Sequence, residues 1–287
     1  MAILTVDNIT YTYGADSPFE KHALRGVSLD IHEGELLGII GHTGSGKSTL
    51  VQHLNGLLRP NDGRILLEGK DIWAQPKKIR DVRFRVGMVF QYPEHQLFED
   101  TIYKDIAFGP KNMGLSEEEI DTRVRQAAAD VGLSEDLLEK SPFDLSGGEK
   151  RRAAIAGVMA MQPQILILDE PTAGLDPRGR EQVLATIRDY QKAHGTTVLL
   201  VTHSMEDVAR VADRVLVMDR GRVAMLDTVE AVFSRANELE EIGLTVPAVT
   251  QVLLLLQKQG VPVDTAAYTV EDAADQLTSL LGGDGGC

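Results

Sequence analysis

The stretch "GELLGIIGHTGSGKSTLVQHL", Gly34 to Leu54, joins an apolar run to a glycine-rich turn and then to a helical pattern. The apolar run is typical of a strand that is buried on both faces. The turn has the spacing Gly, four residues and then Gly-Lys-Ser, which is the pattern of a loop that binds phosphate. Because a strand precedes the turn and a helix follows it, the motif lies in its required context, and we expect a nucleotide site here.

Each part of this loop has a chemical reason. Glycines let the backbone wrap around phosphate oxygens where a side chain would clash, and the N–H groups of the loop and of the following helix point at the anion. The Lys47 side chain reaches the terminal phosphates, and the Ser48 hydroxyl is placed to ligate Mg²⁺. The residues that we expect to bind the nucleotide here are Gly41, His42, Thr43, Gly44, Ser45, Gly46, Lys47, Ser48 and Thr49.

Two further apolar runs end in polar residues. "QILILDE" ends in Asp169 and Glu170, and "TTVLLVTH" ends in His203. Uninterrupted apolar strands predict a parallel sheet covered by helices. A carboxylate at the tip of such a strand suits Mg²⁺ held through water, so we assign Asp169 to the metal. Glu170 is then placed to polarise the attacking water.

Composition limits the classes of protein that fit. The chain has 287 residues and a net charge of -14, which argues against non-specific binding of nucleic acid, because that requires a basic face. The single cysteine, Cys287, cannot form an intrachain disulfide, as is usual in a reducing compartment. The N-terminal stretch has no signal-peptide pattern, and no apolar run approaches the roughly 20 residues of a membrane-spanning helix. We therefore expect an intracellular protein whose contact with a membrane comes through a partner.

Further motifs carry a resemblance to a family. "LSGGE", Leu145 to Glu149, resembles the signature motif of ATP-binding cassette (ABC) ATPases, and "AGLDP", Ala173 to Pro177, resembles their D-loop. Gln91 and His203 match the glutamine of the Q-loop and the switch histidine. The six motifs occur in order across residues 3–225. The resemblance implies an α/β fold of the P-loop NTPase type, with a RecA-like core, an antiparallel β subdomain, an inserted α-helical subdomain and a small, mainly helical C-terminal domain.

The resemblance also assigns roles to residues. In this family two cassettes face each other head to tail, and each ATP lies between the phosphate loop of one chain and the signature of the other. The residues that would act on the chain's own ATP are Lys47, Ser48, Gln91, Asp169, Glu170 and His203. Of these, the metal ligands would be Ser48, Gln91 and Asp169. The catalytic residues would be Glu170, His203, Lys47 and Gln91. The residues that would serve the partner's ATP are Ser146, Gly147, Gly148 and Asp176.

One aromatic residue is expected to stack on adenine. Tyr13, in "TYTYG", matches the position of that aromatic in the family. Tyr11 is a competing candidate, and packing in the core is the alternative role for either ring.

ABC ATPases power importers, exporters and soluble machines. DNA-repair members carry a long coiled-coil insertion, translation factors carry two cassettes, and exporters usually carry membrane helices; none of these features occurs in this sequence. A stand-alone cassette that serves a separate membrane protein is the favoured interpretation. A cassette of a conventional importer, or a soluble ABC ATPase without a transport role, remains an alternative.

The segment "QYPEHQLFEDTIYKDIAFGP", Gln91 to Pro110, narrows the choice. It is similar to the same stretch of ATPases from energy-coupling factor (ECF) transporters, which take up vitamins or transition-metal ions, and it is most like the second ATPase of the heterodimeric ECF modules. We call residues 91–110 the docking segment. Its rings, rimmed by Glu94, Glu99 and Asp100, suit an amphipathic helix with basic residues, which the family's transmembrane coupling protein would present. Packing of the rings inside the helical subdomain is the alternative.

The expected domains follow from these assignments. Residues 1–227 form the nucleotide-binding domain, with the helical subdomain at about 94–160. Residues 228–287 form a helical dimerisation extension that ends in a mobile tail, "GGDGGC". The partner ATPase can be a second copy or a different chain. In this family the transported substrate is chosen by a separate membrane-embedded binding protein, so this chain does not identify it.

Overall fold

The computed structural model describes residues 1–15 and 17–282 of the chain. Asp16 and residues 283–287 lie outside the described residues, so the mobility expected for the glycine-rich tail, which includes Cys287, remains a prediction.

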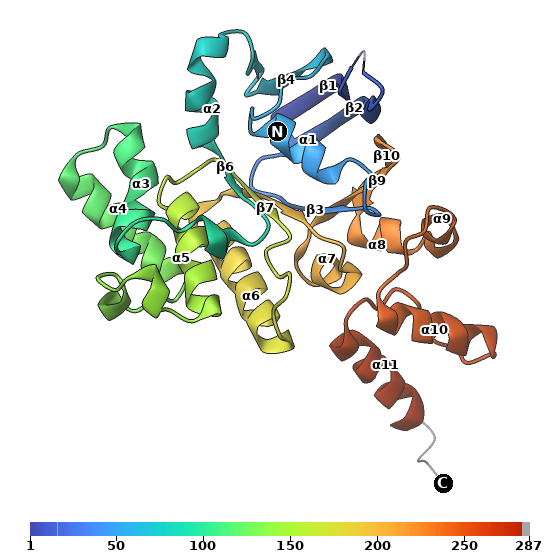
Figure 1. Ribbon diagram of the computed structural model, residues 1–287. Helices are drawn as coiled ribbons and strands as arrows, with labels where there is room; N and C mark the ends of the chain where they lie inside the picture. Colours follow the sequence, from blue (N-terminus) through green and yellow to red (C-terminus); the bar gives the residue numbers. More distant parts are fainter. Residues whose placement is uncertain (16, 283–287) are drawn as a thin grey trace.

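Two sheets form the centre of the molecule (Figure 1). One has four antiparallel strands in the order β2-β1-β4-β5. The other has six strands in the order β10-β9-β3-β8-β7-β6, of which only β10, at the edge, runs antiparallel to its neighbour. The strands are β1 (Ala2–Tyr13), β2 (Lys21–His32), β3 (Leu36–Ile40), β4 (Asp62–Leu67), β5 (Lys70–Asp71), β6 (Val86–Val89), β7 (Ile165–Asp169), β8 (Thr197–Val201), β9 (Arg214–Asp219) and β10 (Arg222–Thr228).

Helices cover the larger sheet and extend from it on both sides. The α-helices are α1 (Lys47–Leu54), α2 (Ile79–Arg85), α3 (Ile102–Met113), α4 (Glu117–Asp130), α5 (Gly147–Met159), α6 (Pro177–His194), α7 (Met205–Val211), α8 (Val229–Phe233), α9 (Ala236–Glu241), α10 (Ala248–Lys258) and α11 (Val270–Gly282). Short 3₁₀ turns occur at η1 (Pro76–Lys78), η2 (Pro93–Gln96), η3 (Glu135–Leu137) and η4 (Pro142–Asp144). Among the residues described, no helix has the length and apolar character needed to cross a bilayer.

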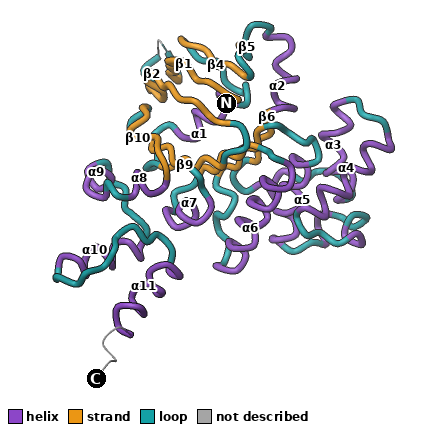
Figure 2. Tube along the Cα trace, turned by 180° about the vertical axis from the view of Figure 1, so that it is seen from behind, coloured by secondary structure: helices purple, strands orange, loops and turns teal. Residues whose placement is uncertain are grey.

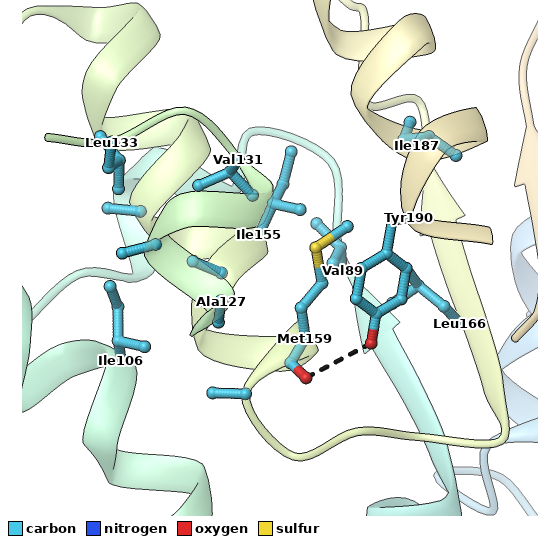
Figure 3. Packing of buried hydrophobic residues seen from close by; sticks show 14 of the residues in the cluster. Val89, Ile106, Ala127, Val131, Leu133, Ile155, Met159, Leu166, Ile187 and Tyr190 are labelled. Carbon is cyan, nitrogen blue, oxygen red and sulfur yellow. Dashed lines mark hydrogen bonds between the residues drawn. The ribbon is translucent and has the colours of Figure 1, made fainter. Parts of the chain in front are cut away.

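The three central strands are buried along their whole length, as the apolar runs predict. Their side chains alternate between two cores. Leu166 of β7 faces the core that includes α3 to α6, whereas its neighbour Ile167 faces the core under α1 and the antiparallel sheet. Figure 3 shows the first core, where the Tyr190 hydroxyl donates a hydrogen bond to the Met159 carbonyl at 3.4 Å. The sheet is thus held from both faces, which fixes its carboxyl edge.

Two helical regions lie on opposite sides of this centre (Figures 1 and 2). Helices α3, α4 and α5 gather on one side and share the first core. On the other side, Val232, Phe233 and Leu239 of α8 and α9 are buried in one cluster with Ile40 and Val215 of the sheet. Helices α10 and α11 have a small cluster of their own, made of Leu253, Val263, Ala267 and Ala273.

Candidate nucleotide site

Four parallel strands bring the predicted site residues to one edge of the sheet. The phosphate loop follows β3, Gln91 follows β6, Glu170 follows β7 and His203 follows β8. The pairings Val89 with Leu168 and Asp169 with Val201 place these strand ends side by side. The carboxyl edge of a parallel sheet is where such folds bind ligands. Residues far apart in the sequence therefore meet here because the strands between them are paired in this order.

The phosphate loop keeps its shape only with glycine at particular positions. Gly41 has φ 155°, and a Cβ there would lie 2.4 Å from the Met218 carbonyl oxygen. Gly46, at φ 107°, precedes α1, and a Cβ there would lie 2.8 Å from the Ala23 carbonyl oxygen. The Lys47 ammonium donates to the Gly41 carbonyl at 2.6 Å. The lysine thus lies folded over the loop, with its charge at the place where phosphate oxygens would bind.

A further contact braces the loop from outside. The His42 ring contacts the Asp219 carboxylate through Nε2 at 2.9 Å and the Thr43 carbonyl through Nδ1 at 2.8 Å. Sequence reasoning missed Asp219. Its signal was present, because "VLVMD" is an apolar run that ends in an acid at the same sheet edge, as "LILDE" does.

Burial dominates the electrostatics beside the loop. Burial lowers the pKa of Lys47, although the charges of Glu170 and Asp169 act in the opposite direction. Burial also raises the pKa of Asp169, although a hydrogen bond from the Ser48 hydroxyl opposes the shift. A hydroxyl and a carboxylate are thus in contact in a partly dry place. Such a pair of hard oxygen ligands suits a divalent cation that takes its other ligands from phosphate and water.

Glu170 and His203 are in direct contact. His203 Nδ1 lies 2.8 Å from Glu170 Oε2. The Glu170 backbone has φ 53°, in the left-handed region, and its N–H donates to the Val201 carbonyl at 2.9 Å. A non-glycine residue in this conformation is strained, and such strain is concentrated at functional sites. The turn after β7 therefore holds the Glu170 carboxylate in a defined orientation.

The two tyrosines of β1 take different positions. The Tyr13 hydroxyl lies 3.3 Å from the Thr49 hydroxyl at the start of α1, and the residue is 38% exposed. Tyr11 packs edge-on against Tyr13 and His53 and belongs to the core under the antiparallel sheet. Tyr13 is thus the ring that borders the phosphate loop, and Tyr11 supports it from behind.

The signature and the D-loop begin two helices. The Ser146 hydroxyl accepts a hydrogen bond from the Glu149 N–H, and the Glu149 carboxylate accepts from both the N–H and the hydroxyl of Ser146, which completes a capping box on α5. Asp176 caps α6 by accepting from Gly179 N–H at 2.8 Å. Helix α5 lies on the helical side of the molecule, away from α1 (Figures 1 and 2). Within one chain, helix α5 and the helix after the phosphate loop therefore lie apart.

The docking segment lines a groove. Phe98 is 65% exposed and packs edge-on against Phe108, with the ring centroids 5.0 Å apart. A groove of about 460 Å³ opens beside these rings between α2, α3 and α5. Gln91 is exposed at the start of the segment. The aromatic pair therefore faces the groove and solvent, while Leu97 packs against the core of the helical subdomain.

The expected role of Glu94 at the rim of the groove is wrong. Its carboxylate binds Arg151 through two hydrogen bonds, at 3.0 and 2.6 Å, and its side chain is only 17% exposed. The groove contains a different acid, Asp105. This carboxylate is buried and accepts from the N–H groups of Phe98 and Glu99 through Oδ1, while Oδ2 has no hydrogen-bond partner among the described residues. Sequence reasoning missed Asp105 because its position on α3 reads as an ordinary exposed helix residue.

Comparisons with known proteins agree on one family. The family model described as ABC transporter matches residues 24–173. Two relatives named energy-coupling factor transporter ATP-binding protein EcfA2 are similar over nearly the whole chain. The protein from Caldanaerobacter subterraneus is 50% identical, with 98% of each chain covered, and that from Clostridium acetobutylicum is 52% identical, with 97% of this chain and 98% of the relative covered.

Solved structures are similar as well. Clostridium perfringens cbiO1, described as part of the ABC transporter complex cbiONQ, has a TM-score of 0.76 and 40% identity, with 90% of this chain and 97% of that chain covered. The ATP-binding cassette MJ0796, in a dimeric post-hydrolysis state bound to ADP and Pi, has a TM-score of 0.71 and 27% identity, with 79% and 98% covered. The expected α/β cassette fold is thereby confirmed.

Proposed function

The chain belongs to the ABC transporter family and, within it, to the ATP-binding proteins of energy-coupling factor transporters, and from this premise we propose that it hydrolyses ATP to drive uptake of a vitamin or a transition-metal ion through membrane partners. The observation that carries the proposal is the 2.8 Å contact between His203 and Glu170 at the sheet edge that also holds Lys47 and Asp169. This arrangement supplies a phosphate cradle, a metal ligand and a carboxylate beside the same space.

Each residue has a task in hydrolysis. The backbone N–H groups of residues 41–49 and the Lys47 ammonium hold the phosphates of ATP, and Tyr13 stacks on the adenine. Ser48, Asp169 and Gln91 would hold Mg²⁺, and the ion would neutralise part of the negative charge of the phosphates. Glu170 accepts a proton from the attacking water, and His203 holds the Glu170 carboxylate in position.

The remaining binding groups come from a second ATPase. Ser146, Gly147 and Gly148 begin α5, and backbone N–H groups at a helix start bind anions. They serve the ATP of the partner ATPase, together with Asp176. The dimeric state described for MJ0796 supports this arrangement. The partner is a second ATPase, which can be another copy of this chain or a different chain.

The groove receives the membrane coupling protein. Asp105 is buried, and its Oδ2 has no hydrogen-bond partner within the part of the chain that the structure describes, so an incoming cation would stabilise its ionised form. An arginine or lysine on an apolar helix would pair with this carboxylate while the rest of that helix covers Phe98 and Phe108. Contact of this kind holds the ATPase peripherally at the cytoplasmic face of the cell membrane.

The C-terminal helices keep the two ATPases together. Val252 and Leu255 of α10 are 51% and 60% exposed, and Val270 of α11 is 70% exposed. Large apolar side chains at the surface indicate an interaction site when they gather on one unit. We assign these helices to dimerisation, as expected for residues 228–287.

Co-purification tests the whole proposal. The chain is expressed with the proteins of its neighbouring genes and isolated in detergent. We expect a complex that contains a membrane coupling protein and hydrolyses ATP, and we expect Lys47→Ala to abolish that hydrolysis without releasing the chain. Isolation of the chain alone, with full turnover as a monomer, would refute a transport role and favour a soluble ATPase.

A further inference from the structure

One buried arginine joins three segments that have separate tasks. The Arg151 side chain, on the second turn of α5, is 4% exposed. Its Nε and one terminal nitrogen donate to the two carboxylate oxygens of Glu94, in the docking segment. Its other terminal nitrogen donates to the carbonyls of Pro171, at 3.2 Å, and Ala173, at 2.7 Å. A planar guanidinium therefore connects the docking segment, the start of the D-loop and α5, which begins within the signature and which we call the signature helix.

The charge state of the pair suits a permanent link. Burial alone would raise the pKa of Glu94, but the hydrogen bond from Arg151 and the charge of Arg151 outweigh it, so the pKa lies below its ordinary value. A second contact supports the same junction, since the Tyr92 ring lies 4.0 Å from the position that a Cβ of Gly174 would take. The docking segment and the D-loop are therefore packed beside each other around Arg151.

Each connected segment has a task in the proposed function, on which this inference rests. The docking segment lines the groove for the membrane protein. The signature and Asp176 of the D-loop serve the partner's ATP. If these three segments moved independently, the movement that closes the ATPase pair around ATP would not be transmitted to the groove.

We propose that Arg151 is a positioning residue that makes the docking segment, the signature helix and the D-loop move as one body, so that ATP binding and membrane docking are energetically coupled. Coupling of this kind is reciprocal: the membrane protein must change the affinity for ATP by the same factor as ATP changes the affinity for the membrane protein.

Arginine suits this position better than other residues. Its rigid fork satisfies both oxygens of one carboxylate and still has donors for two carbonyls. The lysine ammonium has three donors on one atom and cannot reach three separated acceptors with the same geometry. A Lys variant should therefore retain part of the link, and a Gln variant should lose it.

The test measures the coupling itself. The dissociation constant of a slowly hydrolysed ATP analogue is determined for the ATPase pair alone and for its complex with the membrane coupling protein. The ratio of the two constants is the coupling factor, typically about five- to 150-fold in either direction for coupled sites. We expect Arg151→Gln and Glu94→Gln each to bring this ratio to within about twofold of one. We also expect an intermediate ratio for Arg151→Lys and no further loss in the double variant.

A matched control uses an arginine that links nothing across segments. Arg125 on α4 pairs with Asp121 one turn away and with Glu135, all within the helical subdomain. Arg125→Gln should keep the wild-type ratio. General damage to the fold would shift both dissociation constants together and leave their ratio unchanged. If Arg151→Gln folds poorly, Glu94→Gln tests the same link with Arg151 in place. If both Gln variants keep the coupling factor of the wild-type protein, this inference alone is refuted. If the coupling factor of the wild-type protein is itself one, the proposed coupling to a membrane protein is refuted as well.

Discussion

At the scale of single residues, the site depends on groups held in costly positions. Glu170 has a left-handed backbone, and Asp169 and Lys47 are partly desolvated. Asp105 is buried with one oxygen that none of residues 1–15 and 17–282 hydrogen-bonds. Each costs folding free energy, because buried charge and strained backbone are unfavourable. A protein selected only for stability would replace them. Their presence therefore supports the roles proposed for them in hydrolysis and docking.

Replacement of the proposed base should separate binding from turnover. Glu170→Gln keeps the size of the side chain and leaves Asp169 to hold Mg²⁺, but an amide cannot accept a proton from water. We expect the rate of hydrolysis to fall about 10²- to 10⁴-fold and the ATP-bound dimer to accumulate. Size-exclusion chromatography with ATP and a steady-state assay measure the two effects. Wild-type turnover in this variant would remove Glu170 from the mechanism.

Asp105 should show opposite effects on stability and docking. Burial raises its pKa, so the ionised form costs stability above that pKa, and the cost disappears as the pH falls and the side chain binds a proton. Asp105→Asn can still accept from the two backbone N–H groups. We expect the free energy of unfolding at neutral pH to stay equal or to rise, with the difference vanishing in acid.

Docking of the same variant should weaken about tenfold or more, because a partner cation would lose its counter-charge. Denaturation at two pH values and co-purification check these two expectations. Glu99→Gln, at a half-buried acid that does not line the groove, is the matched control and should weaken docking less than Asp105→Asn. Undiminished docking of Asp105→Asn would rule out a cation at this position.

At the scale of elements, the start of α5 combines a helix cap with an anion site. The Glu149 carboxylate accepts from the N–H and hydroxyl of Ser146, which holds the pKa of Glu149 below its ordinary value. This cap stabilises α5 in the free chain. The start of α5 would bind the γ-phosphate of the partner's ATP, and the cap places a negative charge there. The cap thus stabilises the helix but lowers its affinity for an anion.

Neutralising this cap should strengthen the ATP-bound dimer. Glu149→Gln retains an oxygen that can accept from Ser146 but removes the charge, and a charge at a helix start changes the affinity for an anion by about two- to fivefold. The dimer affinity at saturating ATP, measured by analytical ultracentrifugation, should improve by that factor. Glu117→Gln on α4, at a helix start that serves no ATP, should have no effect. A weaker dimer in Glu149→Gln would show that the carboxylate assists the contact.

At the scale of the whole molecule, the central sheets separate two units with different tasks. The helical subdomain lies on one side and α10 and α11 on the other (Figure 1). The side chains of Val232 and Phe233 are buried in the cluster that also holds Ile40 and Val215 of the sheet, so a chain cut at residue 228 would expose that cluster. Val246 is the last buried member of the cluster, and beyond it the partly buried Leu254 and Tyr268 still pack against it.

A chain that ends at Val246 keeps every fully buried member of this cluster and loses the partly buried Leu254 and Tyr268, so we expect it to fold with some loss of stability and to bind ATP. It lacks α10 and α11 with their exposed apolar side chains, so we expect its nucleotide-free association with the other ATPase to weaken by about tenfold or more, while its affinity for Mg-ATP stays close to wild type. Ultracentrifugation without nucleotide gives the first quantity and equilibrium binding the second. Val252→Ser with Leu255→Ser in the full chain tests the same surface without truncation. Association that survives in both would assign dimerisation to another surface.

The sequence by itself determined the phosphate loop, the strand-end acids and the family, because these depend on local spacing. Glycine at set intervals, an apolar run before it and a helix after it specify one backbone path whatever surrounds them. The same reasoning placed Glu170, His203 and Gln91 after strands, and parallel pairing then brought them to one edge.

Only the tertiary structure decided the rest. Glu94 was expected at the rim of the groove but binds Arg151, which lies 57 residues away in the sequence, and Asp219 braces His42 across 177 residues. No local pattern records which distant charge a side chain meets, since the pairing is set by how α5 packs on the docking segment and how β9 lies beside β3. The same reason explains why Asp105 is the acid found in the groove. Its burial depends on the whole fold, and it leaves one carboxylate oxygen with no hydrogen-bond partner in the described part of the chain.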